Sequence, residues 1–580
     1  MNDLKKAISY FFFIQRFFKS KRIFLIFTLY FLATITEVLN IGIIIPFVNI
    51  LVYPDNISEK YSLLNYLSHN FDLSDNSVKI YFLLVIVFLF FLKTIFLIIS
   101  NKVQLNFYAE MRYKIVSFFY RLHLNMPYNY YLNKKKTSEL IRNISMVSSS
   151  YSSFLERFLI VVNDLVLFIG VLAYFIFFYF EIFISIFLPL GFFGIIFYLS
   201  TKRMFFSLGN RLLTLTSEII KSTKDMLDNI LQIKLLRKEK FFEDRFYEIS
   251  KENSYKIAKL GFFQTLPKIL VELLGVIIIV SVLIFLLKAG TKKEEIVSVL
   301  MVVLVISYRA VPFFTKSINF LNYYSSFIPN MIILKNEIAK SDKNILINSQ
   351  NSYANKSEVK NLDNIKLINV SFRYNKNQNY LFKDINLEVN KNILYGISGE
   401  SGAGKSTLVN ILVGLLEPTE GHRTINNIHS KECFIPGISY VSQKNYLQNL
   451  SLKNNIAFGL DNNLIDKDKI NECIKLSKLD SFVNTLPDGI ETQISEFGDN
   501  LSAGQIQRIS IARSLYFNSG LVILDEPTSS LDLQNKLDIQ EMIKKIKKDR
   551  IVVMISHDKE ELKICDKIFK VANNIIEVIK

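Results

Sequence analysis

Residues 399–407 read GESGAGKST, and this stretch decides the fold of the chain around it. It satisfies the pattern G-x-x-x-x-G-K-[ST] and follows the apolar run ILYGIS. In such a loop the glycines let backbone N–H groups approach phosphates, the lysine reaches the β- and γ-phosphates, and the next hydroxyl binds Mg²⁺. The pattern predicts an ATP site with Mg²⁺, and the hydroxyl expected to contact the metal is that of Ser406. The residues expected there are Gly399, Ser401, Gly402, Gly404, Lys405, Ser406 and Thr407.

The segments after residue 365 place this loop in an α/β domain. Short β-branched runs alternate there with helical segments, and the runs include IKLINVSF, ISYVSQ, LVILDE and IVVMISH. This alternation predicts a mostly parallel sheet covered by helices, which is the fold of a P-loop ATPase domain.

Three of these predicted strands end in side chains that suit ATP hydrolysis. LVILDE ends in two carboxylates, and we expect Asp525 to bind Mg²⁺ and Glu526 to polarise the attacking water as a general base. Gln443 follows another strand and is expected at Mg²⁺ and water, whereas His557 follows a third and is expected at the γ-phosphate. Taken singly, either residue is more typical of an ordinary polar strand end. Because parallel sheets bind ligands at the carboxyl ends of their strands, the set predicts one site.

The N-terminal half has the composition of a membrane protein. The chain has 580 residues, of which 50% are hydrophobic, and the apolar excess lies before residue 330. A domain usually has about 50–250 residues, so at least two domains are expected. A helix needs about 20 apolar residues to cross a bilayer. We expect six α-helical membrane spans of an exporter-type domain, at approximately 23–52, 78–100, 158–180, 182–200, 264–288 and 296–325.

Charges in the connecting loops orient these spans. Residues 101–157 carry nine Lys or Arg against three acids, and residues 201–263 carry thirteen against eight, whereas 53–77 carries one Lys against four acids. By the positive-inside rule both long loops, both termini and the C-terminal half are cytoplasmic. The basic residues that flank the spans also explain the formal charge of +17, so we expect no nucleic-acid partner.

The long inner loops have apolar residues at helical spacing, which predicts that the helices continue beyond the membrane. Their tips, around Met126–Tyr131 and Asp228–Ile233, are then expected to dock on another domain; the alternative is a pair of long amphipathic loops. The polar stretch 339–364 reads as a linker. We therefore divide the chain into a transmembrane domain (1–338), this linker and a nucleotide-binding domain (365–580).

Further features bear on the cellular compartment. The segment 8–18 has no signal-peptide character and reads as an amphipathic segment on the membrane surface. Cys433, Cys473 and Cys565 form no metal-ligand spacing and are interpreted as reduced thiols.

Residues 501–508, LSAGQIQR, have no group that can move a proton and no metal ligand. In order and spacing, the P-loop, Gln443, LSAGQ, LVILDE, SSLD (529–532) and His557 resemble the nucleotide-binding domain of an ABC transporter across 365–580. With the six spans before it, the chain is similar to an exporter-type half-transporter.

This resemblance implies roles for further residues. Tyr374 would stack on adenine, and Asp532 would be the acid of the inter-subunit loop. Ser502, Gly504 and Gln505 would form a signature that closes over ATP held by the partner, so a homodimer with two ATP sites is implied. At Ala503 the family commonly has glycine, and a methyl group is tolerated there if φ is negative.

Ionisable residues inside the spans predict the cargo. Such residues are costly in a membrane and by default mark a pathway. The basic ones are Lys93, Lys268, Arg309 and Lys316, and their acidic counterparts are Glu37 and Glu272. Snorkelling or mutual pairing is the alternative explanation. Arg309 and Lys316 are seven residues apart, so they share a helix face that suits a phosphate or pyrophosphate head group.

The spans around these residues resemble those of bacterial lipid-linked oligosaccharide flippases, in the stretches TITEVLNIGIIIPFVNIL, LPKILVELLG and SYRAVPFFTKSINFLNYYSS. The resemblance implies that the four basic residues engage the pyrophosphate of a polyprenyl-linked glycan. It also implies that 59–71 is a short external helix.

Three functional hypotheses follow. The first is ATP-driven flipping of a polyprenyl-diphosphate-linked oligosaccharide across the bacterial cytoplasmic membrane. The second is export of another amphiphile: a lipid, peptide or drug. The third is a channel or sensor that ATP only regulates, and the presence of Glu526 and His557 speaks against it, since a regulatory site need not keep hydrolytic groups.

Overall fold

The structure is a computed structural model. It describes residues 22–580 apart from 53–74, 133–136, 292, 341–356, 359–360, 375–378, 430–432, 435–436, 444, 496–497, 499, 530 and 573. The predicted surface segment 8–18, the predicted external helix 59–71 and most of the predicted linker lie outside the described residues.

The chain forms two compact units. The membrane unit comprises Met1–Met126 and Lys134–Leu346, and the ATPase unit comprises Pro127–Asn133 and Ile347–Lys580. The ATPase unit therefore includes a short piece of the first long inner loop. This piece coincides with the tip that the sequence predicts to dock.

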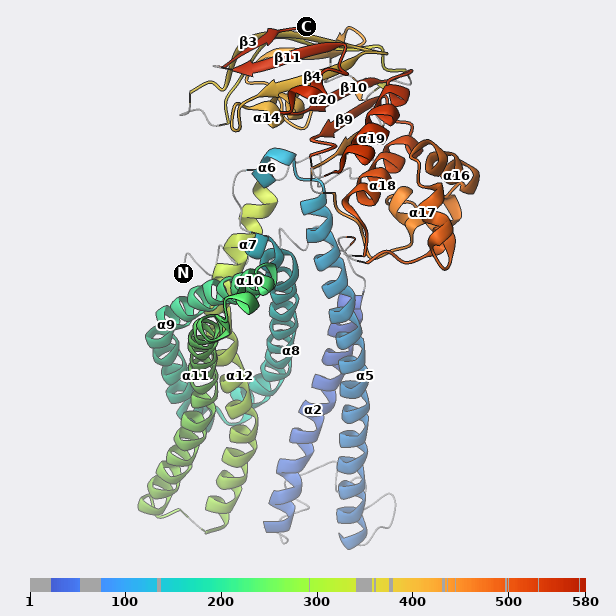
Figure 1. Ribbon diagram of the computed structural model, residues 1–580. Coiled ribbons are helices and arrows are strands. Elements are labelled where there is room, and N and C mark those ends of the chain that lie inside the picture. Colours follow the sequence, from blue (N-terminus) through green and yellow to red (C-terminus); the bar gives the residue numbers. More distant parts are fainter. Residues whose placement is uncertain are drawn as a thin grey trace. The chain divides into compact units, whose positions relative to one another are not determined.

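The membrane unit is built from six helices that are long and apolar enough to cross a membrane (Figure 1). The prediction of six apolar helices is thereby confirmed. The helices are α2 (Arg22–Val52), α5 (Asp75–Leu124), α8 (Ser148–Phe178), α9 (Phe180–Asp228), α11 (Glu239–Lys288) and α12 (Lys293–Lys340).

Five of these helices continue well beyond the predicted spans, as their apolar spacing indicates, whereas α2 matches its span. The first inner loop contains α6 (Tyr128–Leu132), α7 (Thr137–Arg142) and the π-helical turn η2 (Asn143–Val147), and the second contains α10 (Ile230–Leu235). Helices α8 and α9 meet at Tyr179, whose φ of −145° breaks the helix there. The predicted tight turn between the third and fourth spans is confirmed within two residues.

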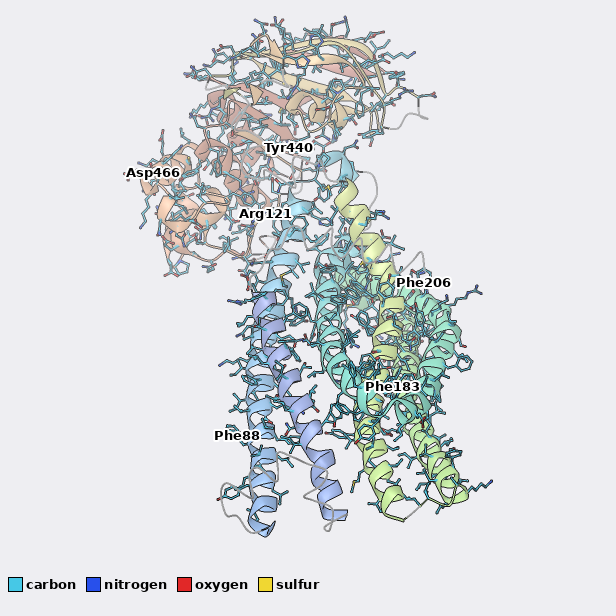
Figure 2. All side chains as sticks on the ribbon, turned by 180° about the vertical axis from the view of Figure 1, so that it is seen from behind. Phe88, Arg121, Phe183, Phe206, Tyr440 and Asp466 are labelled. Atoms are coloured by element: carbon cyan, nitrogen blue, oxygen red, sulfur yellow. The ribbon has the colours of Figure 1, made fainter. Side chains whose placement is uncertain are left out.

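Helix α12 packs against α8, α9 and α11, while α2 packs against α5 and α8. Phe168 of α8 and Phe313 of α12 stack with ring centroids 3.8 Å apart. Other aromatic side chains face outward, such as Phe88 of α5 (Figure 2). Such exposed apolar side chains suit contact with lipid, in which a helix satisfies its own backbone polar groups.

The ATPase unit contains a six-stranded sheet, and its mostly parallel strands confirm the predicted fold. The strands from β11 to β8 are parallel, and β12 is antiparallel to β11. In spatial order they are β12 (Ile575–Val578), β11 (Lys567–Ala572), β4 (Leu394–Gly399), β10 (Ile551–Ile555), β9 (Leu521–Asp525) and β8 (Ile438–Val441).

A second, antiparallel sheet has the order β3 (Phe382–Asn390), β2 (Asn364–Phe372), β5 (Glu420–Ile425) and β6 (Ile428–His429). A short parallel pair joins β1 (Ser357–Glu358) to β7 (Cys433–Phe434). The helices of the unit are α14 (Lys405–Val413), α15 (Leu452–Ile456), α16 (Lys467–Leu476), α17 (Asp480–Thr485), α18 (Ala503–Tyr516), α19 (Leu533–Ile546) and α20 (Lys559–Leu562), with short 3-10 turns η3 (Asn462–Leu464) and η4 (Gly489–Glu491).

Strands β9 and β10 form the centre of the ATPase core. Every residue of β10 is buried, and β9 is buried up to its last residue. Their side chains contribute to two apolar clusters on opposite sides of the sheet. Parallel strands covered on both faces need such continuous apolar runs, which is why LVIL and IVVMI contain no polar residue.

Close approach of α9 to α12 yields a testable prediction at Gly209. A Cβ atom on Gly209 would overlap the carbonyl oxygen of Ser326 in α12, whereas one on Gly261 of α11 would meet nothing within 4 Å. We expect Gly209→Ala to cost about 1–3 kcal/mol through overpacking and to lower the thermal unfolding midpoint of the protein in detergent. Gly261→Ala is the matched control and should not lower it, because alanine favours helix. Equal midpoints for the two variants would contradict this packing.

Candidate nucleotide site

The site lies at the carboxyl edge of the parallel sheet. Strands β4, β8, β9 and β10 end at this edge, and each is followed by a residue predicted to act on ATP. The alignment of β9 with β10 pairs Asp525 with Ile555, so the catalytic segments after both strands start at the same level. Four separate sequence motifs therefore meet in one place.

The phosphate loop has the backbone that its glycines predict. Gly402 and Gly404 have φ values of +85° and +100°, a region that residues with a side chain rarely adopt. A Cβ on Gly404 would also lie 2.8 Å from the ring of Phe382. The loop leads into the N-terminus of α14, where free N–H groups and the helix dipole favour an anion. Lys405 donates hydrogen bonds to the carbonyl oxygens of Gly399 (2.7 Å) and Glu400 (2.9 Å), so its ammonium lies over the loop.

Tyr374 lies beside this loop. Its hydroxyl is 2.6 Å from the hydroxyl of Thr407, which is buried in the first turn of α14. Its ring contacts Phe372 edge to face at 5.0 Å. The ring is thus fixed next to the phosphate-binding helix, and its role in stacking on adenine stays a prediction.

Glu526, which follows β9, is held by groups from the two neighbouring strands, β8 and β10. Its carboxylate lies 2.8 Å from Nδ1 of His557 and accepts a hydrogen bond of 2.7 Å from Nε2 of Gln443. Its backbone N–H donates to the carbonyl oxygen of Ile555 at 2.9 Å, although its φ of 48° lies in the left-handed region. Such strained backbone is typical of functional sites. The structure brings together the three residues that the sequence predicts to be catalytic.

Asp525 has a partner that sequence reasoning missed. The hydroxyl of Tyr440, in β8, donates a hydrogen bond of 2.7 Å to its carboxylate. Burial and then this carboxylate raise the pKa of Tyr440, so the hydroxyl stays protonated as a donor. Tyr440 stands three residues before Gln443, but nothing in the spacing indicates its contact across strands.

The donors at this edge fit Mg²⁺. This ion prefers oxygen ligands, and the predicted ligands Ser406, Asp525 and Gln443 provide a hydroxyl, a carboxylate and an amide oxygen. Because Nε2 of Gln443 donates to Glu526, its amide oxygen remains available as an acceptor. The residues present therefore fit the metal that the nucleotide brings.

The LSAGQ segment forms the start of α18. Ser502 is the N-cap, its hydroxyl accepts from the N–H of Gln505, and the side chain of Gln505 accepts from the N–H of Ser502. Ala503 is the first helical residue and has no positive φ, so its methyl group is tolerated. Gly504 is buried against Asn535, which Asp532 caps at the start of α19. The segment is a rigid helix N-terminus, a structure that suits an anion.

Three of the four basic residues predicted in the spans lie beside acids. Lys93 of α5 is buried in an ion pair with Glu37 of α2, and Lys268 is 3.9 Å from Glu272 on α11. Lys316 of α12 is half exposed and forms an ion pair of 2.8 Å with Asp164 of α8, an acid inside the third span that sequence reasoning missed. Arg309 lies on α12, and its side chain is outside the described part.

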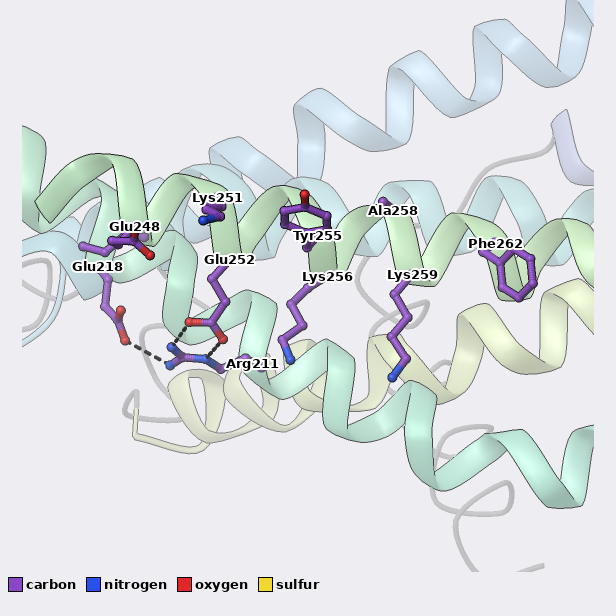
Figure 3. Close-up of a pocket in the computed structure, with 11 residues that line it drawn as sticks. Arg211, Glu218, Glu248, Lys251, Glu252, Tyr255, Lys256, Ala258, Lys259 and Phe262 are labelled. Atoms are coloured by element: carbon purple, nitrogen blue, oxygen red, sulfur yellow. Dashed lines mark hydrogen bonds and ion pairs between the residues drawn. The ribbon is translucent and has the colours of Figure 1, made fainter. Parts of the chain in front are cut away.

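A groove of about 890 Å³ runs along α11 and α9 (Figure 3). Arg211 lies between Glu252, at 2.8 and 2.6 Å, and Glu218, at 3.2 Å. The other charged residues that line the groove are Glu248, Lys251, Lys256 and Lys259. Its lining has three acids against four cations, so a single excess positive charge does not make the groove an anion site.

Two cysteines of the ATPase unit are structural. Cys473 and Cys565 are buried and unpaired, and burial raises the pKa of the Cys473 thiol to about 11. Thiols that stay protonated are poor nucleophiles. Within the described residues, no group of three or more His, Cys, Asp or Glu is arranged to hold a metal ion.

Comparison with known proteins supports the assignment of an ATP site to this unit. Residues 382–529 match the family model described as ABC transporter. The chain is 33% identical over 222 residues to a probable ABC transporter ATP-binding/permease protein of Haemophilus influenzae. The matched region covers 37% of this chain and 39% of that protein. It is 28% identical over 550 residues to the ATP-dependent lipid A-core flippase of Wigglesworthia glossinidia brevipalpis, covering 91% and 90% of the two chains.

A structure of a bacterial Atm1-family ABC exporter with ATP bound matches 96% of this chain and 94% of that chain, with a TM-score of 0.73 and 18% identity. Several curated relatives, including putative multidrug export proteins of Staphylococcus aureus, match over only 37% of their length. The chain thus has the exporter fold, with an ATPase domain of the ABC transporter type after six apolar helices.

The position of Tyr374 generates a prediction about nucleotide affinity. Loss of an aromatic ring stacked on a base costs about 1–3 kcal/mol, so Tyr374→Ala should weaken ATP binding roughly 5- to 150-fold. Tyr374→Phe is the matched control. It keeps the ring, removes the tyrosine hydroxyl that contacts Thr407, and should bind ATP nearly as wild type does. Titration with a fluorescent ATP analogue measures both. Equal affinities for the Ala and Phe variants would show that the ring does not contact adenine.

Proposed function

We propose that this chain works as a homodimer in the bacterial cytoplasmic membrane and uses ATP to flip a polyprenyl-diphosphate-linked oligosaccharide from the inner to the outer leaflet. The observation that carries the ATP-driven part is the convergence of Gln443, Glu526 and His557 beside the phosphate loop. The cargo rests on the basic residues of the spans and on the resemblance of these spans to lipid-linked oligosaccharide flippases.

The residues of the edge divide the work of hydrolysis between them. The N-terminus of α14 and Lys405 hold the phosphates. Ser406, Asp525 and Gln443 would hold Mg²⁺, which would supply positive charge to neutralise the phosphate oxygens. Glu526 accepts the proton of the attacking water. His557 orients Glu526 from the opposite side to Gln443 and contacts the γ-phosphate. The Tyr440 hydroxyl fixes one oxygen of Asp525.

Two features support a homodimer. The N-terminus of α18 presents N–H groups without an acid or base of its own, which suits the phosphate of ATP held by a second copy. The tip of the second inner loop exposes Leu231, Leu235 and Leu236, although this loop belongs to the aqueous side. Clustered exposed leucines on a soluble surface mark a protein interface, and a second ATPase unit would cover them.

Among the described basic residues of the spans, Lys268 and Lys316 are exposed enough to meet an anionic head group. Lys93 is buried in its pair with Glu37, whereas Lys316 is half exposed and bonded to one oxygen of Asp164. A pyrophosphate carries more charge than a carboxylate and can replace Asp164 at the ammonium. Lysine binds it as a point charge, without the fork of an arginine.

The second candidate is export of another amphiphile. A relative that matches nearly the whole chain is named for flipping lipid A-core, which favours a lipid cargo. Relatives named for multidrug export match only 37% of this chain, so their names bear on the ATPase more than on the cargo. We therefore rank a phosphate-bearing lipid above a drug or peptide.

Removal of the proposed general base tests the ATP-driven part. Glu526→Gln keeps the hydrogen-bonding shape but accepts no proton, so ATP turnover should fall roughly 10²- to 10⁴-fold while ATP still binds. Phosphate release and ATP binding of the purified dimer in nanodiscs measure the two effects. Turnover at the wild-type rate would refute the role of Glu526.

Charge removal in the spans tests the cargo. We expect a polyprenyl diphosphate to stimulate the wild-type ATPase in nanodiscs, and Arg309→Gln with Lys316→Gln to abolish stimulation while sparing the basal rate. Lys288→Gln, at the end of α11, is the matched control and should keep stimulation. An uncharged polyprenol should not stimulate any of them. Unchanged stimulation of the double variant would leave the cargo assignment without its physical basis.

A further inference from the structure

A buried polar cluster joins four elements of the membrane unit. It consists of His123 in α5, Arg142 in α7, Asn143 in η2 and Glu337 in α12, and we name it the junction cluster. None of the four side chains belongs to the nucleotide site or to the predicted cargo residues. All four residues are at most 9% exposed.

Asn143 connects the two opposite charges of the cluster. Its side-chain oxygen accepts from Nη2 (2.8 Å) and Nε (3.2 Å) of Arg142, and its Nδ2 donates to Glu337 at 3.4 Å. Nη1 of Arg142 donates to the hydroxyl of Ser217 at 2.6 Å and to the carbonyl oxygen of Leu213 at 3.3 Å. The cluster therefore also holds α9.

His123 attaches the first inner helix. Its Nδ1 donates to the carbonyl oxygen of Phe119 at 2.8 Å, because a carbonyl can only accept, and its Nε2 lies 3.8 Å from Glu337. The last turn of α5 and the last turn of α12 thus meet at the carboxylate of Glu337.

The cluster flanks each place where the chain passes between the two units. These passages follow residues 126, 133 and 346. His123 lies in the last turn of α5 before the first passage, Arg142 ends the first described helix after the second, and Glu337 lies in the last turn of α12 before the third. Residues far apart in sequence are therefore tied together at all three connections to the ATPase unit.

The local backbone is specialised at the same point. Asn143 opens the π-helical turn η2, which contacts α5, α8 and α12. A π-turn rotates the side chains on its two sides relative to a regular α-helix, and such turns are frequent at functional sites. The turn lets Arg142 contact α9 while Asn143 contacts α12.

Buried opposite charges give this cluster a different mechanical character from apolar packing. Moving Asn143 away from Arg142 and Glu337 would take a hydrogen-bond partner from two buried charges, which is unfavourable. Apolar helix faces, in contrast, can slide while remaining in contact. The ends of α5, α7 and α12 should therefore move as one block.

We propose that the junction cluster is a positioning site that locks the three chain connections together, so that ATP-driven movement of the ATPase unit reaches the membrane helices. The inference rests on the proposed function for the ATP-driven movement alone and does not depend on the cargo. It assigns the cluster no contact with ATP.

The test separates coupling from ATP binding. In full-length protein in nanodiscs, with Glu526→Gln and without native cysteines, a spin label at the exposed Leu287 of α11 reports the distance between the two copies. We expect ATP to shift this distance in the parent protein. Asn143→Ala and Glu337→Gln should lose most of the shift and bind ATP as the parent does. Arg142→Lys keeps the buried charge, loses the forked bonds and should lose part of the shift.

Glu252→Gln is the matched control, since it weakens the partly exposed ion pair with Arg211 between α9 and α11 of the same unit. It should keep the full shift. A full shift in Asn143→Ala and Glu337→Gln would overturn the proposal. Loss of ATP binding in these variants would also overturn it, because the cluster would then serve folding. If the parent itself shows no ATP-dependent shift, the proposed function fails first and the inference falls with it.

Discussion

The arrangement of the nucleotide site depends on how one carboxylate is held. Glu526 adopts a left-handed backbone that costs about 1–3 kcal/mol, and its N–H bond to Ile555 stabilises it there. Gln443 and His557 then approach its two oxygens from the ends of β8 and β10. Three strands are thus joined through one side chain. Because β9 and β10 are buried strands of the mostly parallel sheet, the position of Glu526 follows from the core.

The membrane unit follows a different constraint, which is the cost of charge in an apolar surrounding. Its described basic residues in the spans lie beside acids: Lys93 beside Glu37, and Lys316 beside Asp164. Pairing keeps these charges tolerable, but it also sets what a ligand must do. Under the proposed function, an anionic head group that binds Lys316 would displace Asp164, so head-group selectivity would depend on both residues.

Most of the fold was accessible from the sequence because it depends on local patterns. Apolar length fixed the six helices, apolar spacing predicted their continuation into the inner loops, and the loop after ILYGIS identified the phosphate site. The partners of single side chains were not accessible, since they come from other elements. Asp164 pairs with a residue 152 positions away, and Tyr440 with one 85 away, so no spacing rule reveals them.

The same distinction explains why the connections between the units escape sequence reasoning. The loop tips, α6 and α10, are predicted by apolar residues at helical spacing. In the sequence, His123, Asn143 and Glu337 each resemble an ordinary polar residue of a helix. Only their burial together reveals a charge network. Apolar side chains that pack together tolerate changes in the angle between the elements they join. A buried charge network does not, because its hydrogen bonds depend on direction. Under the proposed function, closure of two ATPase units moves the membrane helices, and such a movement requires the chain to stay rigid where it leaves the membrane unit.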